Sequence, residues 1–392
     1  MDIFAKCFEF ETAKEAIKQG FYPYFIPLNE NEGTEVLYQG KRLIMCGSNN
    51  YLGLTTHPKV KEAAKAAVDR FGTSCTGSRF LNGTLAMHEQ LESELADWVG
   101  MDAALIFSTG MQTNLGTISA LVGRDDIVIL DKDDHASIVD GARLGYGKIE
   151  RYRHNDVEHF QRVLESLPEQ AGKLVVMDGL FSMEGDLADL PHLVPIARKY
   201  GARIMVDDAH GMGVLGKGRG TVAHWGMTDQ IDVVMSTFSK SFASLGGFIA
   251  GQRDVVHYIK HHARSLIFSA SIPASNAASA LAALQVMREE PERIERVNEI
   301  GRRMRAGYQS LGFDIGKSET PVVPIIIGDD MKTFLFWKSL FENGVFVNPV
   351  ISPAVAPGHQ LIRTSYMATH TDDQLDRVLE VFGRVGKELG II

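Results

Sequence analysis

The sequence predicts an α/β protein with a mostly parallel sheet that is covered by helices on both faces. Between about residues 103 and 251, six short apolar runs bounded by turn residues alternate with segments of helical periodicity, an order typical of parallel strands joined by helices. The runs are apolar at successive positions, as expected for strands buried on both sides. They are AALIFS (103–108), IVILD (127–131), KLVVMDG (173–179), RIMVDD (203–208), DVVMSTFS (232–239) and GGFIAG (246–251).

The segments on either side of these runs predict two flanking units. Upstream, TEVLYQG and KRLIMCGS have the alternating pattern of a hairpin, and residues 58–70 and 85–99 show helical spacing. From about residue 275, two long helical stretches precede the strand-like runs PVVPIIIG, GVFVNPV and LIRTSYM. We therefore expect an N-terminal arm with a hairpin, a large α/β domain and an α+β C-terminal domain, at 1–45, 46–275 and 276–392.

The composition excludes several classes of protein. Of 392 residues, 45% are apolar and 23% are charged, so the chain should fold rather than remain disordered. The net charge is −9 and no segment concentrates basic residues, which argues against a nucleic-acid partner. No apolar run is long enough to span a membrane, and the N-terminus is charged where a signal peptide needs an apolar core. Three cysteines without CxxC spacing indicate neither a disulfide framework nor a zinc site, so we expect a cytoplasmic protein without a metal.

Residues that could carry chemistry stand at the ends of several predicted strands. Lys240 follows one strand directly and precedes a glycine pair, Asp207 ends another with His210 three residues on, and residues 108–110 turn a third strand into a helix. In open α/β sheets, ligands bind outside the carboxyl ends of the strands, and a glycine turn that opens a helix suits a phosphate. Taken singly, each feature is better explained by a solvated lysine, a helix cap or an ordinary connection. No GxGxxG or GxxxxGK[ST] motif suggests a nucleotide instead.

A cofactor that uses a lysine amine, a carboxylate and a phosphate site together is pyridoxal 5′-phosphate (PLP). The lysine bonds to the cofactor aldehyde, an acidic group keeps the pyridine nitrogen protonated, and a helix N-terminus and hydroxyl groups hold the phosphate. Thr237 and Ser239, on either side of Phe238 just before Lys240, can supply such hydroxyls.

Ordered motifs across nearly the whole chain resemble the α-oxoamine synthases, fold-type I PLP enzymes that condense an amino acid with an acyl-CoA thioester and release CO2. The resemblance implies a fold-type I transferase with a mostly parallel sheet of the seven-stranded type. The motifs are SNNYLGL (48–54), FSTGMQTNLG (107–116), HASIVDGARL (135–144), DGLFSMEGDLADLP (178–191), MVDDAHGMGVLGKGRG (205–220), STFSKS (236–241), FSASIP (268–273) and LIRTSYMATHT (361–371).

The resemblance also implies catalytic roles. Lys240 would bond to the cofactor aldehyde and later remove the substrate Cα proton, and Asp207 would pair with the pyridinium nitrogen. His135 would stack on the ring, and His210 and Ser182 would hydrogen-bond near its phenolic oxygen. His135 follows an acidic run before a helix and could instead be an ordinary cap, and we assign the remaining histidines to the surface or the core.

For the phosphate, the resemblance implies the backbone amides of Gly110 and Met111 and the hydroxyls of Thr237 and Ser239. Many relatives carry an aromatic residue where this chain has Met111. Ser269 corresponds to a position that reaches the phosphate of the neighbouring subunit, which implies a homodimer with shared active sites.

Arg363 and Asn49 would bind the substrate carboxylate. Arg363 lies in a predicted apolar strand, where a guanidinium needs an anionic partner, and a bidentate carboxylate is its best match. A structural aspartate or glutamate could serve instead.

The substrates remain open at this stage. GTSCTGSRFLNGT (72–84) and GVFVNPVISPAVAP (344–357) resemble the bacterial branch of the family that joins L-serine to palmitoyl-CoA, giving 3-ketodihydrosphingosine for sphingolipid biosynthesis. The C-terminal KELGII resembles the branch that joins glycine to acetyl-CoA, and synthesis of 8-amino-7-oxononanoate is a further alternative. A product with a long tail would favour peripheral contact with a membrane. Two other classes are an aminotransferase on the same fold and a binding protein without turnover, neither of which would release CoA thiol.

Overall fold

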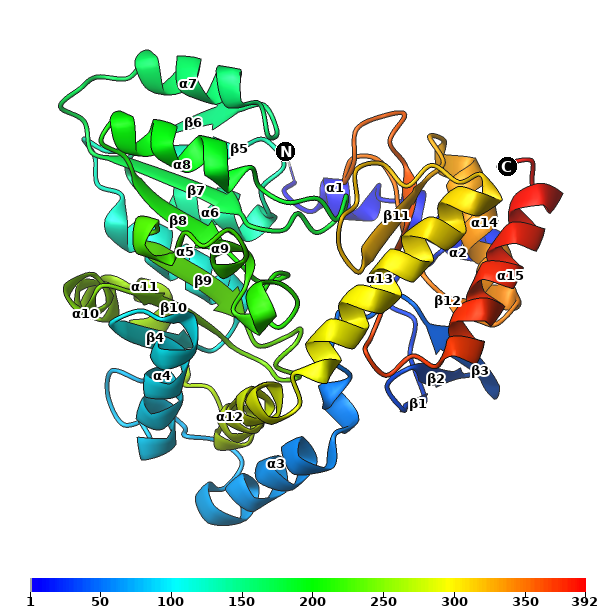
Figure 1. Cartoon of the computed structure of the whole chain (residues 1–392), viewed down its shortest axis with the longest axis horizontal. Helices are drawn as coiled ribbons and strands as arrows, with labels where there is room; N and C mark the ends of the chain where they lie inside the picture. Colours follow the sequence, from blue (N-terminus) through cyan, green and yellow to red (C-terminus); the bar gives the residue numbers. More distant parts are fainter. Residues whose placement is uncertain (1) are drawn as a thin grey trace.

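A computed structural model describes residues 2–392, and its larger lobe is built on one seven-stranded sheet (Figure 1). The strands are β4 (Ala103–Phe107), β5 (Ile127–Asp131), β6 (Lys148–Tyr152), β7 (Lys173–Asp178), β8 (Arg203–Asp207), β9 (Val233–Thr237) and β10 (Gly247–Gly251). Their order is β4-β10-β9-β8-β7-β5-β6. From β9 to β6 all neighbours are parallel, whereas β10 is antiparallel to both β9 and β4. The predicted fold class is confirmed.

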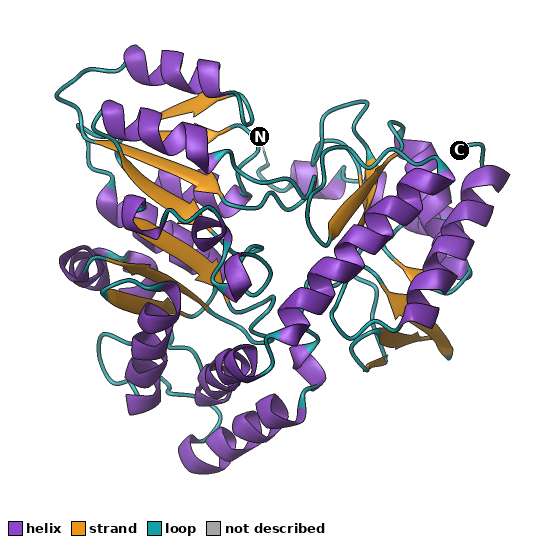
Figure 2. Cartoon of the chain, viewed as in Figure 1, coloured by secondary structure: helices purple, strands orange, loops and turns teal. Residues whose placement is uncertain are grey.

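Helices cover both faces of the large sheet (Figure 2), and alternate strand residues pack against the two different layers. Ile129, Val175 and Val234 share one core with helices on one side of the sheet, and their neighbours Val128, Val176 and Val233 share a second core with helices on the other side. This arrangement explains why the strands are apolar at successive positions. The first layer contains α4 (Ala86–Val99), α7 (Val157–Glu165), α8 (Leu190–Lys199) and α12 (Ala274–Glu289), and the second α5 (Gly110–Leu121), α6 (Ala136–Leu144), α10 (Arg253–His262) and α11 (Arg264–Ile267).

The smaller lobe packs three helices against a three-stranded antiparallel sheet. Its strands are β11 (Val322–Ile326), β13 (Asn348–Val350) and β14 (Leu361–Ser365), with β14 in the centre. The helices are α13 (Glu292–Leu311), α14 (Asp330–Glu342) and α15 (Asp372–Glu388). Tyr308, Phe336 and Phe382 of these helices are fully buried in one apolar cluster.

The predicted N-terminal hairpin is present and joins a strand from the far end of the chain. β2 (Glu35–Tyr38) pairs antiparallel with β3 (Lys41–Met45), and β3 pairs in parallel with β12 (Val345–Phe346). β1 (Glu30–Asn31) completes this four-stranded sheet. The predicted helices at 58–70 and 85–99 correspond to α3 (Pro58–Phe71) and α4, while the division into three domains stays a prediction.

Short elements complete the chain. No helix within residues 2–392 combines the length and the apolar character needed to cross a membrane. The remaining elements are α1 (Ala5–Phe8), α2 (Thr12–Gln19), α9 (Thr221–His224) and the 3-10 turns η1 (Leu54–Thr56), η2 (Gly216–Gly218) and η3 (Thr228–Gln230).

Candidate active site

A cavity of about 510 Å³ lies at the carboxyl ends of β7, β8 and β9 and reaches across to β14 of the smaller lobe. Such a position is where open α/β sheets bind ligands. Except for Ser269, every site residue expected from the sequence contributes to its wall. The lining residues are Asn49, Thr109, Gly110, Met111, His135, Ser137, Asp178, Ser182, Met183, Asp207, Ala209, His210, Met235, Thr237, Ser239, Lys240, Leu245, Asn348, Val350 and Arg363.

Asp207 and Asp208, at the end of β8, have different surroundings. Asp207 lines the cavity, and its carboxylate accepts hydrogen bonds from the Asn114 amide at 2.7 Å and from the Ala209 N–H at 3.0 Å. Asp208 accepts hydrogen bonds from the N–H and the hydroxyl of Thr221, at 2.6 and 2.7 Å, and so holds the start of α9. Burial raises the pKa of Asp208 to about 7. Only Asp207 is therefore available to a ligand.

Lys240 follows β9 and lines the same cavity as Asp207. Burial lowers the pKa of its amine to about 8, the Asp207 and Asp178 carboxylates oppose this change, and the Arg363 charge adds to it. A pKa near 8 leaves an appreciable neutral fraction at pH 7 to 8, and only the neutral amine can act as a nucleophile or a base.

The first turn of α5 has the features of an anion site. Thr109 caps the helix by accepting the Gln112 N–H at 3.1 Å, and the first N–H groups of a helix have no partner within it. Gly110 lies so close to Thr237 that an added Cβ would come within 2.8 Å of Oγ1. The Thr237 and Ser239 hydroxyls lie 3.0 Å apart beside this turn. Free amides at a helix N-terminus together with two hydroxyls suit a phosphate.

His135 caps α6 and is held in a neutral form. Its Nδ1 accepts the Ser137 N–H at 3.2 Å and lies 2.8 Å from the Ser137 hydroxyl, while its backbone N–H donates to Asp178 at 2.7 Å. Burial lowers the pKa of the ring; the Asp207 charge opposes this, and the Lys240 charge adds to it. The helix-cap role considered from the sequence and a place in the cavity wall therefore coexist.

His210 is bonded to a residue that the sequence did not single out. Its Nδ1 lies 2.6 Å from the Tyr51 hydroxyl, although the two residues are 159 positions apart. Burial lowers the pKa of His210 well below its usual value, and the Lys240 and Arg363 charges act in the same direction. A neutral imidazole with a phenol partner can donate or accept a hydrogen bond in the cavity.

Arg363 is buried without an acidic partner. It is 5% exposed; Nε donates to the Ser182 carbonyl at 2.6 Å and a terminal nitrogen donates to Asn49 Oδ1 at 3.0 Å. Within residues 2–392 no aspartate or glutamate forms an ion pair with it, so the structural-acid alternative has no candidate in that range. Since a buried charge is costly unless paired, the arrangement favours an anionic ligand.

Asp178 is a second residue that sequence reasoning missed. It ends β7 directly beside Asp207 in register, lines the cavity and is 5% exposed. Burial and the Asp207 charge raise its pKa well above the usual value. Its position at the end of an apolar run is a signal in the sequence that could have identified it.

Ser269 lies outside the cavity wall. Its hydroxyl accepts a hydrogen bond from the Gln112 side chain at 2.7 Å, and the adjacent Phe268 is 74% exposed. Its expected contact with a neighbouring subunit's phosphate stays a prediction.

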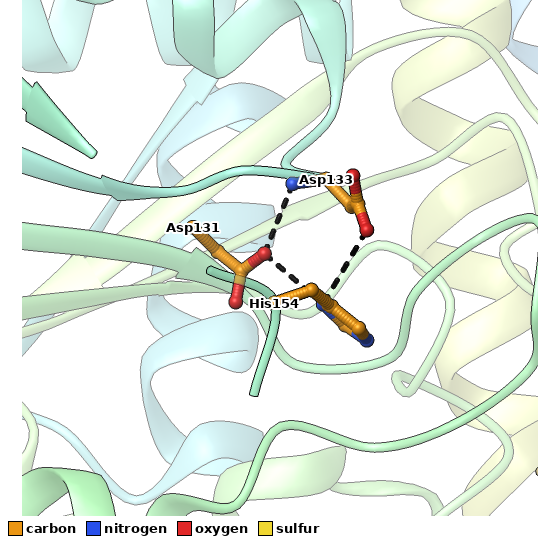
Figure 3. Close-up of side chains that lie close together, drawn as sticks. All are labelled: Asp131, Asp133 and His154. Carbon is orange, nitrogen blue, oxygen red and sulfur yellow. Dashed lines mark hydrogen bonds and ion pairs between the residues drawn. The ribbon is translucent and has the colours of Figure 1, made fainter. Parts of the chain in front are cut away.

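A charged cluster at the end of β5 contains Asp131, Asp133 and His154 (Figure 3). The His154 ring lies 3.0 Å from Asp131 through Nδ1 and 2.9 Å from Asp186 through Nε2. Burial lowers the pKa of His154, but the hydrogen bonds to these two carboxylates outweigh it and raise the pKa to about 10. Because both ring nitrogens already face carboxylates, we interpret the cluster as structural.

The donor set fits PLP. The cavity brings together a lysine of lowered pKa, a buried carboxylate, a helix N-terminus with two hydroxyls and a neutral histidine. These are the groups that would hold the aldehyde, the ring nitrogen, the phosphate and the ring face of this cofactor.

Comparison with known proteins agrees with this geometry. Residues 41–382 match the family described as aminotransferase class I and II. The chain belongs to this family. It is 50% identical to a serine palmitoyltransferase of Sphingobacterium spiritivorum, over 97% of this chain and 96% of the relative. It is 42% identical to an 8-amino-7-oxononanoate synthase of Symbiobacterium thermophilum, over 95% of this chain and 96% of the relative.

A solved structure described as SPT with the PLP internal aldimine superposes with a TM-score of 0.97, at 37% identity and complete coverage of both chains. The predicted membership of the α-oxoamine synthases within the aminotransferase class I and II family is confirmed, as is the fold-type I architecture.

Proposed function

We propose that this chain is a PLP-dependent acyltransferase that condenses L-serine with a long-chain acyl-CoA, palmitoyl-CoA, to give 3-ketodihydrosphingosine, CoA and CO2. The observation that carries the proposal is the cavity in which Lys240, Asp207 and the unpaired Arg363 meet, in a chain that is 46–50% identical to four serine palmitoyltransferases. In the overall reaction a C–C bond forms between the serine Cα and the acyl carbonyl carbon. The thioester sulfur leaves as CoA thiol, and the serine carboxylate leaves as CO2.

The cofactor would be held by residues at the carboxyl ends of β4, β8 and β9. The Gly110 and Met111 amides with the Thr237 and Ser239 hydroxyls would bind the phosphate, and Asp207 would keep the pyridine nitrogen protonated. When bound, PLP withdraws electrons from the substrate Cα and so eases the loss of its proton or carboxylate.

The substrate residues act on the serine. Arg363, already held by Ser182 and Asn49, would bind the serine carboxylate with the guanidinium edge that these two bonds leave free. The Lys240 amine, with a pKa of about 8, is suited to carry the Cα proton. The neutral ring of His135 would cover one face of the reacting group, which leaves the opposite face to Lys240.

We propose that the enzyme is a cytoplasmic homodimer whose active sites use both chains. Phe80, Leu81 and Phe268 expose 56–78% of their surface. The loops that carry them are joined, since the Ser271 N–H donates to the Gly77 carbonyl at 2.9 Å. A second subunit on this surface would cover the apolar side chains and bring its Ser269 to the phosphate site.

A matrix of substrates tests the function. Serine, glycine and alanine are each paired with acetyl-, pimeloyl- and palmitoyl-CoA, and free thiol is measured, with Lys240→Ala as the blank. We expect serine with palmitoyl-CoA to have the highest kcat/KM, since each buried methylene contributes roughly 0.8 kcal/mol. Alanine with pimeloyl-CoA as the best pair would move the assignment to 8-amino-7-oxononanoate synthase, the activity of the 42% identical relative. Glycine with acetyl-CoA would move it to the short-chain branch, and absence of thiol release would refute acyl transfer altogether.

A further inference from the structure

The buried side chain of Asn114 links two residues of the cavity wall through hydrogen bonds. It lies on α5, is 0% exposed and does not line the cavity. Its amide nitrogen donates to Asp207 Oδ2 at 2.7 Å and to the Ser137 hydroxyl at 2.8 Å. That hydroxyl in turn lies 2.8 Å from Nδ1 of His135. The four side chains form one hydrogen-bonded chain from Asp207 to His135.

The chemistry of the four groups fixes which group donates and which accepts in each of these hydrogen bonds. A carboxylate only accepts hydrogen bonds, so Asn114 must turn its amide NH2 group, not its carbonyl, toward Asp207. The second amide hydrogen then points to Ser137, whose oxygen accepts it. The Ser137 hydroxyl is left with its own hydrogen to donate, and His135 Nδ1 is the acceptor within reach. Nδ1 also accepts the Ser137 backbone N–H at 3.2 Å, which places the ring proton on Nε2.

Keeping an asparagine at position 114 has an energetic cost that an apolar side chain would avoid. The Asn114 carbonyl oxygen has no hydrogen-bond partner in the described part of the chain. An unsatisfied buried acceptor is unfavourable, whereas an apolar side chain of similar size would leave none. Gly141 of α6 lies against the backbone of Asn114. A Cβ added at Gly141 would come within 2.8 Å of the backbone oxygen of Asn114. Close approach of α5 and α6 therefore brings the amide to Ser137.

We propose that Asn114 and Ser137 form a positioning relay that orients the Asp207 carboxylate and fixes the His135 proton on Nε2. The proposal rests on the proposed function in so far as Asp207 and His135 contact the cofactor. Asn114 lies outside the cavity wall and Ser137 lines it, and both would act through Asp207 and His135. Because Asp207 and His135 would lie at the ring nitrogen and on the ring face, one relay would set both contacts together.

A double-mutant cycle tests the relay. We expect Asn114→Leu and Ser137→Ala each to lower kcat about ten-fold while the KM for serine changes less than two-fold, since substrate contacts remain. If the two residues act as one unit, kcat of the double variant should fall about ten-fold rather than about one hundred-fold. Ser137→Thr keeps the hydroxyl and should return kcat to within about two-fold of the parent. As a matched control, Asn343→Leu removes an amide that donates to the Ser339 carbonyl in the smaller lobe and should leave kcat unchanged.

The tautomer of His135 gives a readout that needs no turnover. In protein labelled with 15N-histidine, with the signal assigned by His135→Gln, Nδ1 should appear unprotonated in both the cofactor-free and the PLP-loaded parent. Asn114→Leu should shift the signal toward a mixture of tautomers. A proton on Nδ1 in the parent, an unchanged signal in Asn114→Leu, or a multiplicative loss in the double variant would each overturn the relay. Because the cofactor-free spectrum is independent of activity, a failed acyl-transfer assay would not obscure this result.

Discussion

Asp207 and Asp208 are adjacent in the sequence but have different surroundings and therefore different chemical roles. Both are nearly inaccessible, at 3% and 0% exposure, but successive side chains at a strand end point in opposite directions. Asp207 faces the cavity and Lys240, and Asp208 faces the turn at Thr221. Of two chemically identical side chains, one is thereby open to a ligand in the cavity and the other holds a turn.

This contrast gives a first prediction. Asp207→Asn should keep the fold and lower kcat by roughly 100-fold or more, because a neutral amide cannot hold a pyridine nitrogen protonated. Asp208→Asn should keep most of kcat but lower the free energy of unfolding by roughly 1–3 kcal/mol, since an amide cannot accept all of the Thr221 hydrogen bonds. Steady-state kinetics and urea unfolding of both variants measure the two effects. The reverse pattern would exchange the two roles.

Arg363 allows a second prediction about substrate binding. Arg363→Lys keeps the charge but loses the planar donor set that bonds Ser182 and Asn49, so the KM for serine should rise roughly 10–100-fold. The KM for the acyl-CoA should change little. Arg377→Lys, at an exposed pair with Glu380, is the matched control and should leave both KM values unchanged. Equal increases in the two KM values would mean that Arg363 does not bind the serine carboxylate.

The sequence predicted most of the residues in the cavity wall but not their partners. Lys240 and Asp207 could be inferred because both follow apolar strands, a pattern visible within a few residues. Tyr51 and Asn114 could not be inferred, since their contacts with His210 and Asp207 join positions 159 and 93 residues apart. Hydrogen bonds of this range depend on the packing of whole helices and strands, which no local pattern records.

At the scale of elements, the close approach of α5 to β9 shapes the proposed phosphate site. An added Cβ at Gly110 would lie 2.8 Å from Thr237 Oγ1, and the φ of Gly110 is not positive, so the obstacle is steric and not conformational. Gly110→Ala should therefore weaken PLP binding by roughly 10–100-fold with a modest loss of stability. Titration of the cofactor-free variant with PLP, followed by absorbance, measures the change. Unaltered affinity would show that the first turn of α5 does not hold the phosphate.

His154 joins the end of β5 to the loop that carries Ser182, through Asp131 and Asp186. Its folded pKa, about 10, lies above the ordinary value of 6.5, so its stabilisation is fully present below about pH 6.5 and is lost as the pH rises through 10. His154→Gln should be less stable than the parent by roughly 2–4 kcal/mol at pH 6, and the difference should shrink toward pH 10. Urea unfolding at pH 6, 8 and 10 measures it. A difference independent of pH would mean that the ring is neutral in the fold.

The elements themselves were predictable where burial imposes a pattern and unpredictable where it does not. Each of the six apolar runs contains a strand of the large sheet, because two helical layers demand apolar residues on both faces. β6, with the sequence KIERY, was missed because it lies at the edge of the sheet, beyond β5, where most of its side chains are not fully buried. The antiparallel direction of β10 also left no trace in its composition, GFIAG.

At the scale of the whole molecule, two segments far apart in the chain surround one cavity. Arg363 and Asn348 come from the smaller lobe and Lys240 from the larger one, so the site requires the two lobes to stay together. Ser269 is not part of the cavity wall, and Phe268 and Leu81 are exposed on the surface. A second copy of the chain, as proposed above, would use that surface to complete the phosphate site.

Mixed dimers test whether the sites are shared. Lys240→Ala homodimers should be inactive, and Ser269→Glu homodimers should bind PLP poorly, because the partner's carboxylate would repel the phosphate. When the two variants are unfolded together and refolded at equal amounts, about half of the dimers should be hybrids. In each hybrid, one site combines Lys240 of the Ser269→Glu chain with Ser269 of the other, so activity should return to about one quarter of the parent. If Ser269 instead served the site of its own chain, neither site of a hybrid would be complete. One site would lack Lys240 and the other would lack Ser269, so mixing would restore no activity.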